Sequence, residues 1–102
     1  MIRAAMPDKF LSLSIDILPQ KREYERTSTT VTNAYVMPGV SGYLDRLDHE
    51  LQTAGVRAGL LIMQSNGGIM TADFLAHRAV AALGSGPTGG VMGACSVAGR
   101  AG

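Results

Sequence analysis

The glycine-rich stretch on which the fold depends reads Gly84-Ser85-Gly86-Pro87-Thr88-Gly89-Gly90. An apolar run over residues 79–83 precedes it and predicts a strand, and the run from residue 91 onward predicts a helix. Glycine permits positive φ and a close backbone approach to a ligand, and the first N–H groups of a following helix can hold an anion. The stretch therefore predicts a strand-to-helix turn of the kind that binds phosphate.

Two phosphate-binding patterns can be compared with this stretch. Gly84-x-Gly86-x-x-Gly89 satisfies the local part of the dinucleotide-binding fingerprint. Its acidic ribose ligand is expected about 20 residues further on, which is beyond the last residue here. A P-loop is rejected, because Gly90-Val91 stands where that motif requires Lys and Ser or Thr. A turn that only lets a helix and a strand pack closely remains an alternative.

Composition narrows the class of protein. The chain has 102 residues, 46% apolar and 17% charged, with a net charge of +1. This balance gives no electrostatic reason to expect nucleic acid or an anionic membrane as a partner. No apolar run reaches membrane-spanning length and no signal peptide is recognisable, so we expect a cytoplasmic protein. The single cysteine, Cys95, cannot form an internal disulfide.

The first third of the chain predicts a strand followed by a charged segment. Residues 10–18 alternate apolar and polar side chains, which is typical of a half-buried strand, and Pro19 ends it. The charged run over residues 21–26 predicts a solvated helix start. Residues 27–32 are compatible with a strand or with a helix that Pro38 then interrupts.

The middle of the chain gives the clearest periodicity. Val40, Leu44, Leu47 and Leu51 recur at helical spacing, and Gly55 is the natural stop of that helix. The elements expected after it are a buried strand over residues 60–65, a tight turn over 66–68, a return strand over 69–71 and a short helix over 73–77 capped by Thr71 or Asp73. Together these units indicate a single α/β layer structure.

Other chemical signals are weak. A serine-hydrolase elbow needs glycine two residues before the serine, but Met63 precedes Ser65 and Leu83 precedes Ser85. His49 and His77 lack a ligand cluster and are interpreted as solvated. The same interpretation holds for the helical pair Asp45 and Asp48. Cys95 is interpreted as a packing residue on an apolar helix.

Several sequence blocks, taken in order, resemble the hydantoinase A and 5-oxoprolinase family, to which ketone carboxylase subunits are related. The blocks are Ser12-Leu13-Ser14, Leu18-Pro19, residues 22–30, Asn33-Ala34-Tyr35, Tyr43-Leu44, residues 63–68 and Ser85-Gly86-Pro87-x-Gly89-Gly90-Val91. Thr88 departs from the pattern, since that family more often has alanine there.

The resemblance implies a partial ATPase lobe of the actin, Hsp70 and sugar-kinase type, which is ribonuclease H-like, with a short mixed sheet and helices. It also implies an ATP- and magnesium-dependent enzyme that opens a cyclic amide of the hydantoin or 5-oxoproline type, by phosphorylating the ring carbonyl oxygen before water attacks. A related carboxylation, and a B-type partner subunit, remain open. The residues expected to line or shape the nucleotide cleft are Ser85, Gly86, Gly89 and Gly90, and secondarily Asn66, Gly67 and Gly68.

The family holds its phosphates and metal with Asp-x-Gly-Gly-Thr hairpins, and the chain contains none. We therefore expect residues 1–102 to be one internal fragment that is inactive alone and that carries no catalytic or metal-binding residue. Exposed sheet edges would also favour self-association. Two alternatives remain, namely a non-catalytic interaction or structural module with a glycine turn, and a truncated dinucleotide-binding unit.

Overall fold

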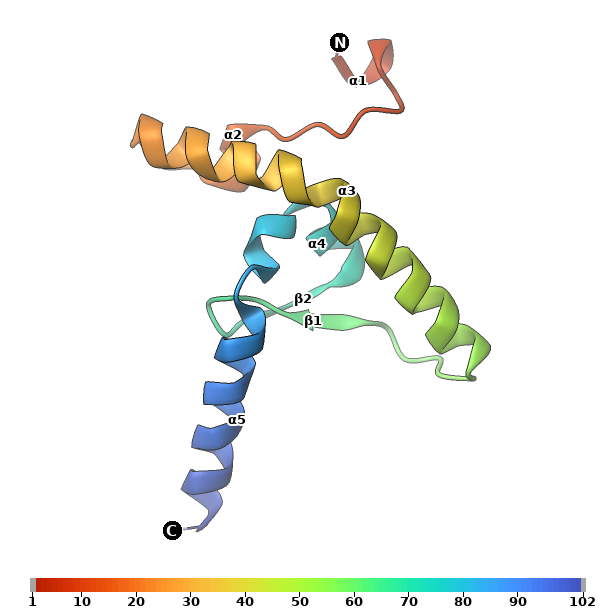
Figure 1. Ribbon diagram of the computed structural model, residues 1–102, viewed down its shortest axis with the longest axis vertical. Coiled ribbons are helices and arrows are strands. Elements are labelled where there is room, and N and C mark those ends of the chain that lie inside the picture. Colours follow the sequence, from red (N-terminus) through yellow and green to blue (C-terminus); the bar gives the residue numbers. More distant parts are fainter. Residues whose placement is uncertain (1, 102) are drawn as a thin grey trace.

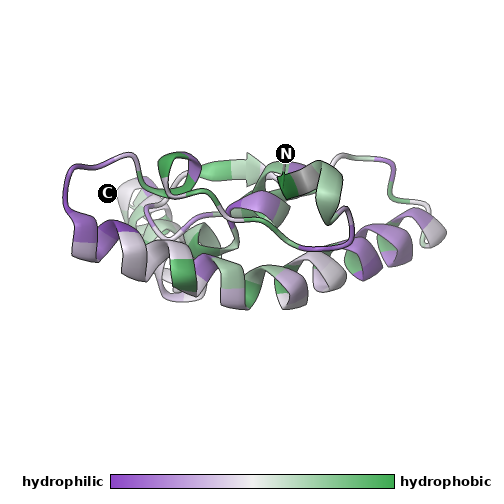
Figure 2. Ribbon diagram, turned by 90° about the horizontal axis from the view of Figure 1, so that it is seen from above, coloured by the Kyte–Doolittle hydropathy of each residue, from purple (hydrophilic) through white to green (hydrophobic). Residues whose placement is uncertain are grey.

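The computed structural model describes residues 2–101 and shows a flat molecule with principal extents of 55 × 40 × 16 Å (Figure 1). The long helix α3 (Glu23–Thr53) crosses it, and α5 (Ser85–Ala101) projects away from the other elements. Seen from above, α3 lies along one side and the remaining segments lie beside it (Figure 2). The other elements are α1 (Ile2–Ala5), α2 (Ser14–Ile17), β1 (Leu61–Met63), β2 (Ile69–Thr71), α4 (Ala72–His77) and the 3₁₀ helix η1 (Ala79–Ala82).

The fold is mixed α/β and mostly helical, which agrees with the predicted class at that level. Its sheet is one antiparallel pair within residues 2–101, with Ile62 opposite Met70 and Met63 opposite Ile69. The predicted hairpin is therefore confirmed, although β1 is shorter than residues 60–65 and is half exposed rather than buried. None of the helices in this part of the chain combines the length and apolar character needed to cross a membrane.

Helix α3 runs without interruption through Pro38, so the predicted break there is wrong. The inward-facing positions explain the continuity, because their helical spacing continues across the proline. These positions are Asn33, Met37, Val40, Leu44, Leu47 and Leu51. The proline is exposed and removes one backbone hydrogen bond, while Met37 and Leu44 on either side of it are buried. The packing of these inward-facing residues therefore outweighs the loss of one backbone hydrogen bond at Pro38. The ends of α3 are more hydrophilic than its middle (Figure 2).

The end of α3 confirms the predicted stop at Gly55. Gly55 has φ of 85°, the left-handed conformation that favours glycine. The Val56 N–H donates to the Leu51 carbonyl at 2.9 Å, and the Gly55 N–H donates to the Gln52 carbonyl at 3.0 Å. This pair of bonds is the Schellman arrangement that satisfies the last carbonyls of a helix.

Residues 10–18 do not form the predicted strand. An extended segment leads into the single turn of α2, in which the Asp16 and Ile17 N–H groups both donate to the Leu13 carbonyl. The alternating pattern can only become a strand if a neighbouring strand supplies a hydrogen-bonded ladder, and β1 pairs with β2 instead. The segment packs on α3 through Ile17, which is 8% exposed.

Residues 79–83 are also not the predicted strand, because residues 79–82 form η1. The backbone groups of this segment bond to partners other than a strand. The Val80 N–H donates to the Asn33 Oδ1 atom at 3.0 Å, and the Ala81 carbonyl accepts from the Ser65 N–H at 2.8 Å. The apolar run therefore connects α3 to the hairpin.

Thr71, one of the two predicted caps, begins α4 at Ala72. Its hydroxyl oxygen accepts a hydrogen bond from the Phe74 N–H at 3.4 Å. Leu75 of α4 is buried beside α3 and joins Ile17, Met37, Leu44 and Ala79 in the apolar core. The core of the described residues is therefore small.

A buried asparagine lies at the centre of this core. Asn33 is 0% exposed and uses both ends of its amide. Its Nδ2 group donates to Ser12 Oγ at 2.8 Å and to the His77 carbonyl at 3.2 Å, and its Oδ1 accepts from Val80 N. This residue joins the extended N-terminal segment, α3, α4 and η1.

We predict that Asn33→Leu, which keeps the branched shape and removes the side-chain hydrogen bonds, lowers the free energy of unfolding by about 3 kcal/mol. Urea denaturation followed by circular dichroism measures this. The control is Thr32→Ala, whose hydroxyl bonds only to the Ser28 carbonyl at the surface of the same helix, and we expect less than about 0.5 kcal/mol there. Equal losses in the two variants would contradict the role of Asn33.

We also predict that Pro38→Ala raises the stability of the chain by about 2 kcal/mol, since it restores a helical hydrogen bond and loses no buried contact. Thermal and urea unfolding report the gain. Pro19→Ala is the matched control, because Pro19 lies outside every helix. A destabilised Pro38→Ala chain would show that α3 is not continuous through this position.

Candidate functional site

The glycine-rich stretch is mostly helix rather than turn, which corrects the predicted strand-turn-helix boundary. Only Gly84 has a positive φ, of 80°, and α5 begins at Ser85. Pro87 fits inside the first turn because N–H groups there have no partner within the helix, so its missing N–H forfeits no bond. The predicted site residues Ser85, Gly86, Gly89 and Gly90 consequently lie on the first turns of α5.

The second group of predicted site residues forms the hairpin turn between β1 and β2. The Gln64 N–H donates to the Gly68 carbonyl at 2.8 Å, and the Gly68 N–H donates to Asn66 Oδ1 at 2.9 Å. Gly67 has φ of 86°, which a side chain would strain. The turn is thus closed by its own backbone and by the Asn66 side chain.

The structure brings these two predicted groups together. The Thr88 hydroxyl, on α5, donates to the Ser65 carbonyl at 2.8 Å, with the Gly84 carbonyl also within reach at 3.2 Å. A Cβ atom at Gly89 would lie 3.1 Å from the Met63 sulfur, and one at Gly67 would lie 3.7 Å from the Met92 sulfur. Glycine at position 89 therefore lets α5 approach the hairpin closely, whereas the distance at Gly67 is an ordinary van der Waals contact and its positive φ is what favours glycine there.

Two other glycines of the predicted site have no such internal explanation. Cβ atoms at Gly86 and Gly90 would meet nothing within 4 Å. These positions face open space, and no residue of α5 is buried, although Ser85, Thr88 and Gly89 are half-buried. Cys95 is therefore exposed here, contrary to the packing role predicted for it. His49 and His77 are exposed, as predicted.

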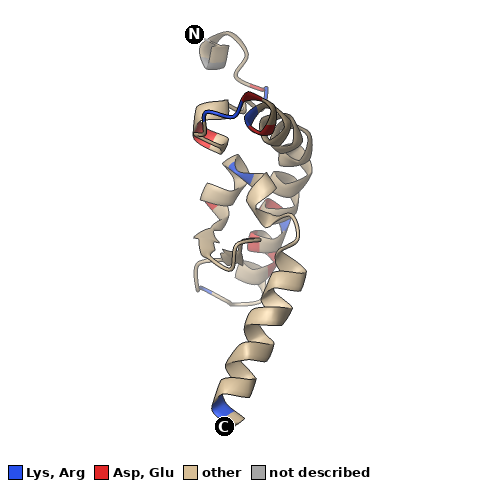
Figure 3. Cartoon of the chain, turned by 90° about the vertical axis from the view of Figure 1, so that its left-hand side faces the viewer, with Lys and Arg blue, Asp and Glu red and all other residues tan. Residues whose placement is uncertain are grey.

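The electrostatic character of this region is neutral to weakly positive. Figure 3 shows no acidic residue on α5, and its one charged residue, Arg100, lies in the last turn. Within residues 2–101, no three His, Cys, Asp or Glu side chains come together in a way that could hold a metal ion. The first turn of α5 offers N–H groups to an anion and no carboxylate to repel it.

A cavity of about 390 Å³ opens beside the hairpin turn. Polar groups from the turn line one side of it, and Arg78 supplies its only charged side chain. Its lining residues are Ile17, Leu18, Thr29, Gln64, Ser65, Asn66, Met70, Arg78, Val80 and Ala81. The cavity connects the predicted turn residue Asn66 with the N-terminal segment of the chain.

The sequence alone did not identify Thr88, Met63 or Arg78 as part of this region. The sequence does mark Thr88 as a departure from the alanine that the resembling family more often has, but that departure gives no indication of its hydrogen bond to Ser65. The contact of Met63 with Gly89 and the position of Arg78 depend on segments that lie far apart in the sequence, and no local pattern marks them.

Comparison with known proteins identifies the family. Residues 26–102 match the Hydantoinase/oxoprolinase family. The chain is 44% identical over 87 residues to caprolactamase subunit alpha of Pseudomonas jessenii, an alignment that covers 85% of this chain and 12% of that protein. It is 43% identical over 79 residues to an uncharacterised protein of Methanocaldococcus jannaschii, covering 78% of this chain and 12% of the relative.

The chain therefore belongs to the hydantoinase/oxoprolinase family. It spans about an eighth of the length of these two relatives, since 12% of each is covered. No solved structure is a significant match to it.

We predict that Thr88→Val, which removes the hydroxyl and keeps the shape, lowers the free energy of unfolding by about 1 kcal/mol. It should also speed hydrogen exchange of the Gly68 amide, because the hairpin loses its tether to α5. Thr88→Ser keeps the hydroxyl and should remain within about 0.5 kcal/mol of the parent chain. Identical behaviour of the two variants would show that the bond to Ser65 does not hold α5 in place.

Proposed function

We propose that this chain is an internal segment of an ATP-dependent hydrolase of cyclic amides, and that the hairpin turn and the start of α5 shape one wall of the nucleotide cleft. The observation that carries the proposal is the direct packing of the two glycine groups on each other in a chain of the hydantoinase/oxoprolinase family. Such a junction permits close backbone approach to a ligand.

The residues present fit part of an ATP site. The first turn of α5 supplies N–H donors and has no acidic residue, which suits phosphate oxygens. The open space at Gly86 and Gly90 would let a ligand approach the helix backbone. No carboxylate cluster for magnesium exists among the described residues, so the metal and the groups that grip it would come from Asp-x-Gly-Gly-Thr hairpins elsewhere in the parent protein.

ATP would activate the ring carbonyl oxygen of the cyclic amide so that water can attack the carbon. In that scheme the residues of this chain position the ligand and exclude water. They transfer no protons, because the predicted site has no titratable side chain at Ser85, Gly86, Gly89 and Gly90. We propose on the same basis that α3, the hairpin and α5 belong to one lobe of an actin-like ATPase, and that the chain alone is inactive.

A partner subunit is part of the proposal. The relative from Pseudomonas jessenii is a subunit alpha, which supports a second subunit for the parent of this chain. The exposure of every residue from Gly90 to Ala101 of α5 is the observation that favours the alternative, a non-catalytic interaction module. The two functions differ in whether the chain binds nucleotide.

We predict that calorimetric titration of the chain with magnesium-ATP gives a dissociation constant of roughly millimolar or better. Gly89→Val should abolish the binding, because the added side chain would meet the Met63 sulfur and displace the hairpin. Gly99→Val is the matched control, because Gly99 lies on the same helix with open space around it. This variant should bind magnesium-ATP as tightly as the chain without substitutions.

Absence of magnesium-ATP binding by the chain without substitutions would favour the interaction module. Substrate-dependent ATP hydrolysis by the purified chain would contradict the claim that it is inactive alone.

A further inference from the structure

The hairpin turn contains one of the two asparagines of the chain, Asn66, and Gly67 follows it directly. Asparagine is a chemically labile residue, because the backbone nitrogen of the next residue can attack its side-chain carbonyl carbon and close a five-membered ring. A following glycine has no Cβ atom to crowd that nitrogen, and its backbone reaches the required geometry easily. The turn therefore contains a dipeptide that favours this ring closure.

The fold has a structural use for both residues of this dipeptide. Gly67 has φ of 86°, a conformation that a side chain would strain. The Asn66 Oδ1 atom accepts a hydrogen bond from the Gly68 N–H at 2.9 Å and so helps to close the turn. The reactive pair consequently cannot be replaced without a cost to the hairpin.

The side-chain carbonyl group of Asn66 is accessible and polarised. Asn66 is exposed and borders the cavity of about 390 Å³ beside the turn, so water reaches it. When a nitrogen adds to the carbonyl carbon, negative charge develops on Oδ1, and the Gly68 N–H already points at that atom. A positioned donor of this kind stabilises the developing charge.

The nitrogen that would attack is restrained while the turn is closed. The Gly67 N–H donates to the Gln64 carbonyl at 3.1 Å, which is near the long end of the usual range of about 2.7–3.2 Å. An N–H group held in this bond is protected from solvent base. Opening of this one hydrogen bond therefore controls whether the ring can close.

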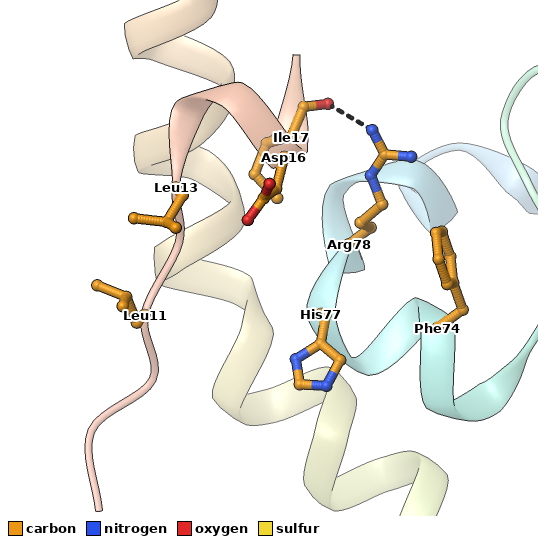
Figure 4. A pocket seen from close by; sticks show the side chains of 7 residues that line it. All are labelled: Leu11, Leu13, Asp16, Ile17, Phe74, His77 and Arg78. Atoms are coloured by element: carbon orange, nitrogen blue, oxygen red, sulfur yellow. Dashed lines mark hydrogen bonds between the residues drawn. The ribbon is translucent and has the colours of Figure 1, made fainter. Parts of the chain in front are cut away.

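The side chains around the turn do not include a base for this reaction. Among the described residues that line the cavity beside it, Arg78 is the only one with an ionisable side chain, and a guanidinium has no lone pair to accept a proton. Asp16 and His77 line the neighbouring cavity instead (Figure 4). The ionisable residues of α5 are Cys95 and Arg100, in its second half. The proton of the Gly67 amide therefore passes to solvent hydroxide, and the rate should rise with pH.

We propose that Asn66 is a modification site, which converts to aspartate and isoaspartate when the turn opens. The Gly67 nitrogen bonds to Cγ of Asn66, the Cγ–Nδ2 bond breaks and ammonia leaves, which gives a cyclic imide. Water then opens the imide. Attack at Cγ gives aspartate, and attack at the main-chain carbonyl carbon gives isoaspartate, whose backbone runs through Cβ and Cγ. One water is consumed and one ammonia is released, with no oxidation or reduction.

Either product adds a negative charge to a part of the chain that has none. Residues 54–72 and 74–101 contain no acidic residue, and one more carboxylate lowers the formal charge of the chain from +1 to zero. Aspartate keeps an oxygen that can accept the Gly68 N–H. Isoaspartate lengthens the main chain by one carbon, so the bond between the Gln64 N–H and the Gly68 carbonyl cannot keep its geometry.

The test is incubation of the 102-residue chain in heavy-oxygen water at neutral and at mildly alkaline pH, followed by peptide mass spectrometry. Asn33 is the internal control, because it is 0% exposed and is followed by Ala34 rather than glycine. We expect the label at residue 66 in both isomers, faster at the higher pH, and none at residue 33. Absence of label at residue 66, or equal labelling of the two asparagines, would overturn the proposal.

Unfolding separates the chemistry of the dipeptide from the effect of the turn. In urea the Gly67 N–H loses its bond to Gln64, so we expect the ring to close about fivefold faster than in the folded chain, the factor that one net backbone hydrogen bond supplies. Equal rates in the two states would refute control by the turn. Asn66→Gln would need a larger ring and should stay unmodified in both states, and labelling of this variant at the same rate would refute attack on the Asn66 side chain.

The effect of the modification on nucleotide binding rests on the proposed function. Asn66→Asp reproduces the charge of the aspartate product and should weaken magnesium-ATP binding about threefold. Gln20→Glu adds the same charge outside both cavities and should leave the affinity unchanged. Labelling of residue 66 without any magnesium-ATP binding would refute the proposed cleft and leave the modification site standing. Magnesium-ATP binding without labelling would refute only the modification.

Discussion

The amide of Asn33 is the constraint on which the arrangement of the other elements depends. It is buried in the middle of α3 and bonds to Ser12, to the His77 carbonyl and to the Val80 N–H. A buried amide must satisfy its donors and acceptor, so these three segments can occupy only one position relative to α3. Because the apolar core is small, packing alone would not fix the relative positions of these segments. The hydrogen bonds of Asn33 do so.

The candidate site depends on that constraint through a short series of hydrogen bonds. Val80 lies in η1, whose Ala81 carbonyl binds the Ser65 N–H, and the Ser65 carbonyl in turn accepts from the Thr88 hydroxyl. The hairpin therefore links α5 to α3 and fixes the position of one helix relative to the other. No residue of α5 is buried, so this tether and the contacts of Gly67 and Gly89 orient the helix.

Part of the candidate site could be predicted from the sequence. Ser85, Gly86, Gly89 and Gly90 were identified together with Asn66, Gly67 and Gly68, because glycine and asparagine clusters mark tight backbone geometry. Their contact could not be predicted, since Thr88 bonds to a backbone carbonyl 23 residues away, and a carbonyl has no residue type to recognise. The role of Arg78 was missed for the same reason.

The sequence by itself determined the features that arise within a few residues, namely the stop at Gly55, the hairpin around Asn66 and the blocks that indicate the family, and it narrowed the cap of α4 to Thr71 or Asp73. Only the tertiary structure decided that residues 10–18 and 79–83 are not strands and that α3 continues through Pro38. A strand requires a partner that no local pattern supplies, and the cost of a proline inside a helix is settled by the packing on either side of it.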